Sequence, residues 1–334
     1  MYRVLQPVLL RIDAERAHTL TLKLLNLAQQ LGVLQWALPR PVSRPLELLG
    51  LKFSNRVGLA AGFDKNATCI DALGALGFGF IELGTVTPEP QPGNPRPRIF
   101  RIPEAQAVVN RMGFPNAGVA ALLARLRLRR FAGICGVNIG KNAVTPLERA
   151  AADYVTCMRA VYPYADYIAV NISSPNTAGL RELQREAQLR PLLESLLETR
   201  ARLEAEQGRR LPLLVKLSPD LADEELSSTA AVIGALRIDG VIATNTTIRR
   251  PGVAGLAAAE QTGGLSGAPL LPLATATVRR LRAELGAGVA IIGVGGIHSV
   301  ESAREMFAAG ADLIELYTGF AYRGPRLVRE LAQL

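Results

Sequence analysis

The sequence is poor in the two residue types from which disulfide frameworks, zinc sites and many catalytic triads are built. Its three cysteines, Cys69, Cys135 and Cys157, are scattered without CxxC spacing. This pattern argues against a disulfide framework and a zinc site, and it fits a reducing compartment. With only two histidines, His18 and His298, a metal centre or triad built on histidine is nearly excluded. We therefore expect no bound metal.

The sequence also lacks a long apolar run. No stretch reaches the roughly 20 apolar residues that are needed to span a bilayer. Four charged residues near the N-terminus, Arg11, Asp13, Glu15 and Arg16, interrupt any apolar core of the kind that a signal peptide requires. Charged residues make up only 20% of the chain and no low-complexity tract is present, which argues against disorder. We expect a folded chain with neither a transmembrane helix nor a signal peptide.

Acidic residues are fewer than basic ones, so the chain carries a formal net charge of +9. This charge leaves three kinds of partner open: nucleic acid, an anionic membrane surface, or acidic small molecules. The length of 334 residues and the hydrophobic content of 49% allow a large core. Length alone suggests two domains, but α/β barrels of this size often form one.

The first forty residues form a segment of their own. Asp13 can cap a helix that ends at Gly32, and Trp36 lies in a short apolar group beyond it. The leucines assigned to the apolar face of this helix are Leu20, Leu22, Leu24, Leu25, Leu27 and Leu31. The helix either packs on its own domain or lies on a membrane surface, with its apolar face toward the lipid and basic residues at its flanks. Pro41–Pro45 reads as a linker, so we expect one domain over residues 1–44 and a second over residues 45–334.

From the linker onward, short apolar runs alternate with amphipathic stretches, as expected of strands and helices. The predicted strands are Val57–Ala61, Phe80–Val86, Gly133–Ile139, Tyr167–Ile172, Leu213–Leu217, Val241–Ala243, Ala290–Val294 and Leu313–Tyr317. The helices predicted between or after them are Cys69–Leu76, Val119–Arg130, Pro146–Tyr162, Pro191–Glu206, Asp223–Leu236, Pro272–Leu285 and Val300–Ala309. Eight such strands predict an α/β protein with a closed (β/α)₈ barrel and a small N-terminal helical extension. An open doubly wound sheet is the alternative, weakened because no GxGxxG follows the first strand.

Polar and glycine-rich segments follow the predicted strands. The fourth strand breaks into Ser173–Thr177, where Pro175 biases Ser174 away from helical geometry. The other strand ends carry Ala61–Lys65, Gly84–Thr85, Asn138–Lys141, Lys216, Thr244–Thr246, Gly293–Gly296 and Tyr317–Gly319. Any one of these segments could be an ordinary turn. The C-terminal strand ends of a barrel form its active site, so as a set they indicate a ligand.

The chemistry of these segments suits a flavin and a small ring. Glycines after the seventh and eighth strands suit a phosphate, and Gly267 adds a close backbone approach. Lys65 and Lys216 would both face the barrel mouth, where a bound anion or electron-rich ring must offset their charge. Flavin mononucleotide (FMN) meets both needs. The carboxamides that would converge from different loops suit a ureide or imide ring, and they belong to Asn110, Asn171, Asn176 and Asn245.

Seven motifs carry a resemblance to a known family. They are Ala60–Lys65, Ile81–Pro88, Asn110–Phe114, Asn138–Lys141, Asn171–Thr177, Thr244–Thr246 and Gly293–Gly296. In this order they resemble the dihydroorotate dehydrogenases, over nearly the whole chain. The soluble classes of that family carry a cysteine base where this chain has Ser174, and they lack an N-terminal extension. The chain is therefore similar to the membrane-associated, quinone-using class, in which the extension guards a tunnel to the flavin. Residues 248–261 match no motif.

The resemblance implies oxidation of dihydroorotate to orotate in pyrimidine synthesis. Ser174 would take the proton from C5, with Thr177 and a water as its relay, while C6 delivers hydride to one FMN per subunit that a quinone reoxidises. The implied FMN contacts are Ala61, Gly62, Lys65, Thr85, Asn138, Asn171, Lys216, Thr244, Gly267, Gly296, Tyr317 and Thr318. The implied substrate contacts are Lys65, Asn110, Arg111, Met112, Gly113, Phe114, Asn171, Asn176, Asn245 and Thr246.

The class also implies where the chain works and with what. We expect a peripheral protein on the cytoplasmic side of the cell inner membrane, bound to its anionic surface, with no nucleic acid and no obligate protein partner. Two alternatives stay open. An FMN barrel that reduces uridine in tRNA would use the positive charge, although this chain has no separate C-terminal RNA-binding domain. A membrane-surface scaffold without catalysis would purify colourless.

Overall fold

The computed structural model describes residue 6 and residues 11–334. Eight parallel strands close into a barrel, and neighbours in the barrel follow one another along the chain. The strands are β3 (Val57–Leu59), β4 (Phe80–Val86), β7 (Ile134–Ile139), β8 (Tyr167–Asn171), β9 (Leu213–Leu217), β10 (Gly240–Ala243), β12 (Ala290–Val294) and β13 (Leu313–Leu316). The predicted (β/α)₈ barrel is therefore confirmed, and the open sheet is excluded because β13 pairs with β3.

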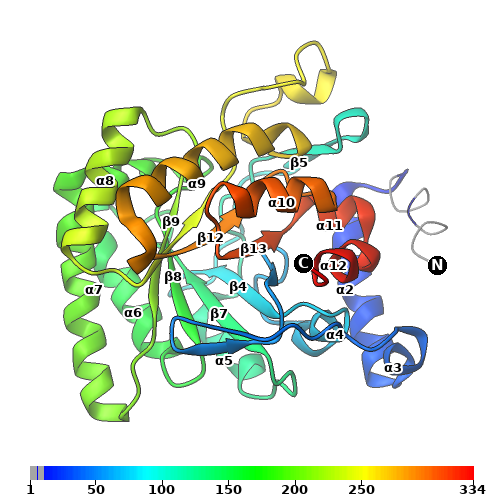
Figure 1. Ribbon diagram of the computed structural model, residues 1–334, viewed down its shortest axis with the longest axis horizontal. Helices are drawn as coiled ribbons and strands as arrows, with labels where there is room; N and C mark the ends of the chain where they lie inside the picture. Colours follow the sequence, from blue (N-terminus) through cyan, green and yellow to red (C-terminus); the bar gives the residue numbers. More distant parts are fainter. Residues whose placement is uncertain (1–5, 7–10) are drawn as a thin grey trace.

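Helices surround the barrel (Figure 1). They are α4 (Ile70–Ala75), α5 (Gly118–Leu126), α6 (Ala150–Val161), α7 (Glu186–Gln207), α8 (Asp223–Ala235), α9 (Leu271–Leu285), α10 (Val300–Ala308), α11 (Thr318–Arg323) and α12 (Pro325–Leu331). Helices α11 and α12 have no counterpart among the predicted helices, and α7 differs in its start, since it begins at Glu186 and carries Pro191 inside it. Proline favours the first turn of a helix, and that preference put the predicted start too late.

The core lies in two layers. Apolar residues on the outer face of the strands pack against the helices. The barrel interior is filled by the opposite faces, including Phe80, Tyr167 and Ile292, which are fully buried. A hairpin of β1 (Leu46–Leu48) and β2 (Leu51–Phe53) brings Phe53 against this interior cluster. Because the interior is packed with side chains, ligand space is confined to the end where the polar strand termini lie.

A three-stranded antiparallel sheet joins two long connections of the barrel, the one after β4 and the one after β10. Strands β5 (Ile99–Ile102) and β6 (Ala107–Asn110) come from one loop and β11 (Gly264–Gly267) from the other. The pairing sets Asn110 opposite Gly264 and Ala107 opposite Gly267. Residues 248–261, for which no role was predicted, are fixed beside this sheet. Arg250 donates to the carbonyl oxygens of Ala259, Gln261 and Gly263.

The N-terminal segment forms α2 (Ala14–Gln30) and α3 (Val33–Ala37), which lie beside α4 (Figure 1). The predicted cap is present, since Asp13 Oδ1 accepts a hydrogen bond from the Arg16 amide at 2.9 Å. The prediction that Leu22 and Leu25 widen the apolar stripe is wrong, because both pack inward against the core. At 3.6 residues per turn, Leu22 lies on nearly the opposite face from Leu20 and Leu24.

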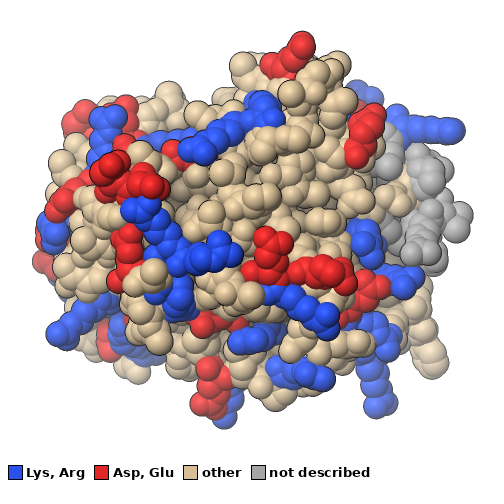
Figure 2. All heavy atoms as spheres, turned by 45° about the horizontal axis from the view of Figure 1, so that its top comes forward, with Lys and Arg blue, Asp and Glu red and all other residues tan. Residues whose placement is uncertain are grey.

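One face of the two N-terminal helices is apolar and exposed. Its members are Leu20, Leu24, Leu27, Leu31, Val33 and Trp36, and the Trp36 side chain is 91% exposed. Across residues 6 and 11–334, no helix is long and apolar enough to cross a membrane. On the face of the molecule drawn in Figure 2, basic and acidic side chains are interspersed, without a continuous basic surface. The division of the chain at residue 44 stays a prediction.

Candidate active site

A cavity with about 970 Å³ of empty space, part of it open to solvent, lies at the carboxyl ends of the barrel strands. Its volume is at the upper end of the usual range for small-molecule and cofactor sites. Most of the predicted site residues line it. From the FMN set these are Ala61, Gly62, Lys65, Thr85, Asn171, Lys216, Thr244, Gly267, Gly296, Tyr317 and Thr318. From the substrate set they are Lys65, Asn110, Met112, Gly113, Phe114, Asn171, Asn176, Asn245 and Thr246, joined by Ser174.

Three predicted residues do not line the cavity. Asn138 lies one layer behind it, where its Oδ1 accepts a hydrogen bond from the Thr85 hydroxyl at 2.5 Å. Arg111 points away and stacks over the Phe100 ring at 4.6 Å. Thr177 is buried, and its hydroxyl has no hydrogen-bond partner among the described residues. Their roles stay predictions.

The predicted convergence of carboxamides is present. Asn245 Nδ2 donates to Asn171 Oδ1 at 3.3 Å and to the Ser173 hydroxyl at 3.1 Å. Asn176 Nδ2 donates to Asn110 Oδ1 at 3.2 Å. These four side chains come from β6, β8 and the loops that follow β8 and β10, so only the closed barrel brings them together. They offer donors and acceptors on one wall of the cavity.

Ser174 sits on a loop that one arginine holds in place. Ser174 is 5% exposed, and its hydroxyl oxygen accepts a long hydrogen bond from the backbone N–H of Asn176 at 3.3 Å. Arg181 donates to the Ser173 carbonyl oxygen, the Thr246 carbonyl oxygen and the Asp220 carboxylate. This bracing was missed in the sequence, where Arg181 lies among the charged residues of a loop. It ties together the loops that follow β8 and β10.

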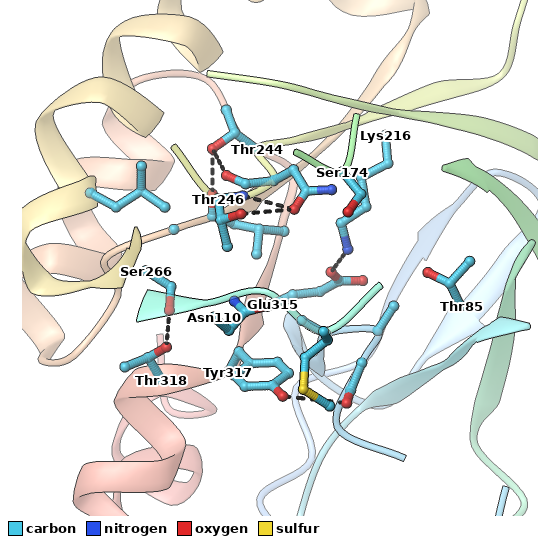
Figure 3. Close-up of a pocket in the computed structure, with 18 of the residues that line it drawn as sticks. Thr85, Asn110, Ser174, Lys216, Thr244, Thr246, Ser266, Glu315, Tyr317 and Thr318 are labelled. Atoms are coloured by element: carbon cyan, nitrogen blue, oxygen red, sulfur yellow. Dashed lines mark hydrogen bonds and ion pairs between the residues drawn. The ribbon is translucent and has the colours of Figure 1, made fainter. Parts of the chain in front are cut away.

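Lys216 is held by two glutamates that the sequence analysis did not single out. Its Nζ lies 3.1 Å from Glu82 Oε1 and 3.6 Å from Glu315 Oε2, and Figure 3 shows it beside Glu315. Burial lowers the pKa of Lys216, but the two carboxylates outweigh burial and the pKa is raised overall. The expectation that a bound ligand must offset this charge is therefore wrong for Lys216. A glutamate in the middle of an apolar strand was the overlooked signal in both Ile81–Leu83 and Ile314–Leu316.

Lys65 has a different environment. Its Nζ donates to the Gly62 carbonyl oxygen at 2.6 Å. Burial, together with the nearby Arg98 guanidinium, lowers the pKa of Lys65 to about 8. No carboxylate forms a salt bridge with it among the described residues. The charge of Lys65 is therefore not balanced by a salt bridge, as expected for a lysine that binds an anionic ligand.

Two glycines on the cavity wall are required by the close packing of the protein's own backbone. Gly296 has a φ of +76°, and a Cβ there would lie 2.3 Å from the Leu271 nitrogen. Gly267 has a φ of +99°, and a Cβ there would lie 2.2 Å from the Gln106 carbonyl oxygen. Both positions therefore need glycine. On the same wall the hydroxyls of Ser266 and Thr318 are 2.8 Å apart (Figure 3).

A second cavity, with about 1260 Å³ of empty space including open solvent, lies between α2 and the barrel. It shares Lys65, Met112 and Tyr317 with the first cavity. Edge-on aromatic contacts run from His18 to Phe63, 4.8 Å between centroids, and from Phe63 to Tyr317, 5.5 Å. Burial, with a smaller effect of Lys65, lowers the pKa of His18 to about 4, so His18 is neutral near pH 7.

The fold and the cavity define a (β/α)₈-barrel enzyme with its site at the carboxyl ends of the strands. A family model described as dihydroorotate dehydrogenase matches residues 45–333. The chain belongs to this family, which confirms the resemblance seen in the sequence motifs. It is an oxidoreductase, and the family implies a flavin.

The curated relatives match over almost their full length. The chain is 55% identical to a dihydroorotate dehydrogenase (quinone) of Xanthomonas oryzae pv. oryzae, over 99% of this chain and 94% of the relative. It is 54% identical to one of Paraburkholderia xenovorans, over 100% of this chain and 98% of the relative. Among solved structures, a ligand-free dihydroorotate dehydrogenase of Eimeria tenella superposes with a TM-score of 0.87 at 39% identity, covering 96% of this chain and 93% of that one.

Proposed function

We propose that this dihydroorotate dehydrogenase oxidises dihydroorotate to orotate with one FMN per subunit, Ser174 as the base and a membrane quinone as the final acceptor. The observation that carries the proposal is the meeting of Ser174, four carboxamides and Lys216 on one cavity. The quinone is also named in the descriptions of the curated relatives. The product serves pyrimidine synthesis.

The cavity suits both the phosphate and the ring of FMN. The backbone around Gly267 and Gly296, with Thr318, would hold the phosphate, because all three residues line the cavity. Lys216, Asn171 and Thr85 would contact the ring from the strand ends, with Asn138 acting through Thr85. The remaining predicted contacts are Ala61, Gly62, Lys65, Thr244 and Tyr317. When bound, FMN accepts hydride from the substrate and gives up the electrons to the quinone.

The carboxamide wall would bind the ring of dihydroorotate. Asn110, Asn171, Asn176 and Asn245 together present donors and acceptors to a ureide. Lys65 and the backbone around Gly113 would hold the substrate carboxylate. Of the two lysines that line the cavity, Lys65 is the one that forms no salt bridge with a carboxylate of the described residues. The rest of the predicted set is Arg111, Met112, Phe114 and Thr246. Arg111 would act through its backbone, because its side chain points away.

Ser174 would remove the proton from C5 of the substrate. A serine hydroxyl is a weak base at its ordinary pKa, so its own proton must pass to another group. Thr177 lies three residues along the same loop, with a buried hydroxyl that is free to donate and accept. A relay from Ser174 through a water to Thr177 would supply that path. Burial of Ser174 keeps bulk water from competing for the substrate proton.

The second cavity would admit the quinone. It opens beside α2 and reaches the first cavity at Lys65, Met112 and Tyr317. The exposed apolar face around Leu24 and Trp36 would rest on the membrane surface, and anionic lipid would attract the positively charged chain. We place the chain on the cytoplasmic side of the inner membrane as a peripheral protein.

An absorption spectrum of the purified protein tests the central claim. The protein should be yellow, and anaerobic dihydroorotate should bleach the flavin band. Quinone should restore the band once the substrate has been consumed. A colourless protein, or a flavin band that dihydroorotate leaves unchanged, would contradict the proposal.

A further inference from the structure

The Lys216 cluster contains more acid than its single cation can balance. Glu82 on β4 and Glu315 on β13 are 0% and 1% exposed, and both form ion pairs with the Lys216 ammonium group. Two carboxylates and one ammonium would leave a net charge of −1 inside the barrel. A buried charge without a partner is costly, so one of the two carboxyl groups must be protonated and neutral.

The hydrogen bonds distinguish the two acids. Glu82 Oε1 accepts from Asn138 Nδ2 at 2.9 Å and from Lys216 Nζ at 3.1 Å, while Oε2 accepts from the Tyr167 hydroxyl at 3.1 Å. Glu82 is thus surrounded by donors, which stabilise the ionised form of a carboxyl. Neither oxygen of Glu315 has a hydrogen-bond partner among the described residues. Its contact with Lys216 is longer than a hydrogen bond.

The charged and titratable groups around Glu315 come from three strands that face it across the barrel interior. They are Glu82 on β4, Tyr167 on β8 and Lys216 on β9. The nearby interior positions of β10 and β12 are apolar, with Ile242 and Ile292. Burial, and next the negative charge of Glu82, raise the pKa of Glu315 well above its usual range, although Lys216 opposes them. The Tyr167 hydroxyl also stays protonated, because burial and Glu82 raise its pKa.

We propose that Glu315 is a neutral carboxylic acid in the folded protein, while Glu82 keeps its negative charge. One ionised glutamate then balances Lys216, and the cluster carries no net charge. Glu315 lines the proposed flavin cavity, so the inference deepens the proposed function and, for its cofactor part, rests on it. Lys216 stays a cation with an N–H left for the cavity, because only Glu82 takes a full hydrogen bond from it. Glu315 is thus a positioning residue for Lys216.

The consequence for the flavin is electrostatic. A net negative charge beside the ring would disfavour the addition of electrons, whereas a neutral cluster would not. Glu315→Gln reproduces a neutral side chain of nearly the same size and shape. We expect this holoenzyme to keep its flavin and to show the wild-type midpoint potential at pH 7. A changed potential, or failure of Glu315→Gln to fold or retain flavin, would count against the proposal.

Infrared difference spectroscopy tests the proton directly, without turnover. Wild-type holoenzyme minus Glu315→Gln, recorded at pH 8, should show the carbonyl stretch of one protonated carboxylic acid, shifted in D₂O. Glu82→Gln removes the charge that keeps Glu315 protonated, so the band should disappear in that variant. Carboxylate bands alone in the wild-type difference would overturn the proposal.

Thermal unfolding against pH gives an independent answer. A carboxyl that is protonated in the folded protein, but ionised in the unfolded chain above pH ~4.3, lowers the free energy of unfolding as pH rises. The Tm of Glu315→Gln minus that of the wild type should therefore grow from pH 5 to pH 8. A difference that does not change with pH would contradict a stored proton. Neither measurement depends on dihydroorotate, so failure of the proposed reaction would leave both results interpretable.

Discussion

Arg181 Nε donates a hydrogen bond to the Ser173 carbonyl oxygen at 3.1 Å, one residue before the proposed base. The other nitrogens of this guanidinium reach the Thr246 carbonyl oxygen at 3.0 Å and Asp220 Oδ2 at 2.9 Å. The loop that carries Ser174 and the loop that carries Asn245 and Thr246 are therefore fixed relative to each other by one side chain. This contact links the proposed base to the wall proposed to orient its substrate.

Arg181→Lys should loosen that arrangement without removing the charge. A lysine is a point donor and cannot reproduce three directed contacts. We expect kcat to fall by about 10-fold to 10²-fold, since small misplacements of reacting groups have effects of this size. Flavin content should be unchanged. Rapid-mixing measurement of flavin reduction checks this, and a wild-type rate would show that the bracing is unimportant.

Ser174→Ala should abolish proton removal while leaving binding intact. The flavin should be retained and orotate should still bind, because the carboxamide wall is untouched. Flavin reduction by dihydroorotate should slow by a factor on the order of 10² to 10⁴, the usual contribution of a general base. Stopped-flow absorbance measures the rate and orotate titration measures binding. Near-normal reduction would remove Ser174 from the mechanism.

Lys216→Ala should purify with little flavin. The substitution removes the cation from Glu82 and Glu315 and leaves buried carboxyl groups without their partner. Lys141→Ala is the matched control, since Lys141 is also a buried lysine close to the carboxyl end of a strand. Its ammonium group donates to the carbonyl oxygens of Asn142 and Thr145 outside the cavity. The ratio of flavin absorbance to protein absorbance measures the flavin content of each purified variant. Full flavin in the Lys216 variant would make this lysine dispensable for cofactor binding.

Substitutions that add negative charge to the exposed face of α2 and α3 should disrupt membrane binding but leave the reaction with dihydroorotate intact. Leu24 and Trp36 are 55% and 91% exposed, so Leu24→Glu with Trp36→Glu leaves packing intact. We expect weaker sedimentation with anionic liposomes and slower turnover with long-tailed quinones, but unchanged reduction by dihydroorotate. Leu128→Glu is a control at another exposed leucine, 77% exposed. Normal liposome binding by the double variant would contradict the membrane role.

The ion pair between Glu15 and Arg98 should tie α2 to the segment that precedes β5 in a pH-dependent way. Glu15 also contacts Arg96 and is 14% exposed, while Arg98 is 5% exposed. Burial acts to raise the pKa of Glu15, but both arginines outweigh it and the pKa is lowered. A carboxyl with a lowered pKa stabilises the fold above its unfolded pKa and loses that effect as pH falls through its folded pKa.

Glu15→Gln should therefore destabilise the protein by about 2 kcal/mol at pH 7, as for other charged hydrogen bonds. The difference from wild type should shrink below pH ~4, where the unfolded carboxyl is protonated. Chemical denaturation at several pH values measures this. A constant difference across pH would mean that packing, and not charge, is responsible.

The local sequence determined the order and type of the elements. Apolar runs such as Phe80–Val86 predicted strands because a buried parallel strand needs apolar residues on both faces. The polar strand ends predicted the cavity, because the closed barrel collects all its carboxyl termini at one end. The helix cap at Asp13 was also visible, since capping depends only on neighbours in the chain.

Only the tertiary structure decided which residues share an environment. Glu82 and Glu315 are 233 positions apart in the sequence, and they meet over Lys216 because β4, β9 and β13 face one interior. In the same way, Leu22 packs inward although it neighbours the exposed Leu24, and Arg181 reaches loops from two different strands. Periodicity and local preference report on contacts a few residues apart. Charge balance in a buried site depends on how far-separated segments pack, so it follows from the closed barrel alone.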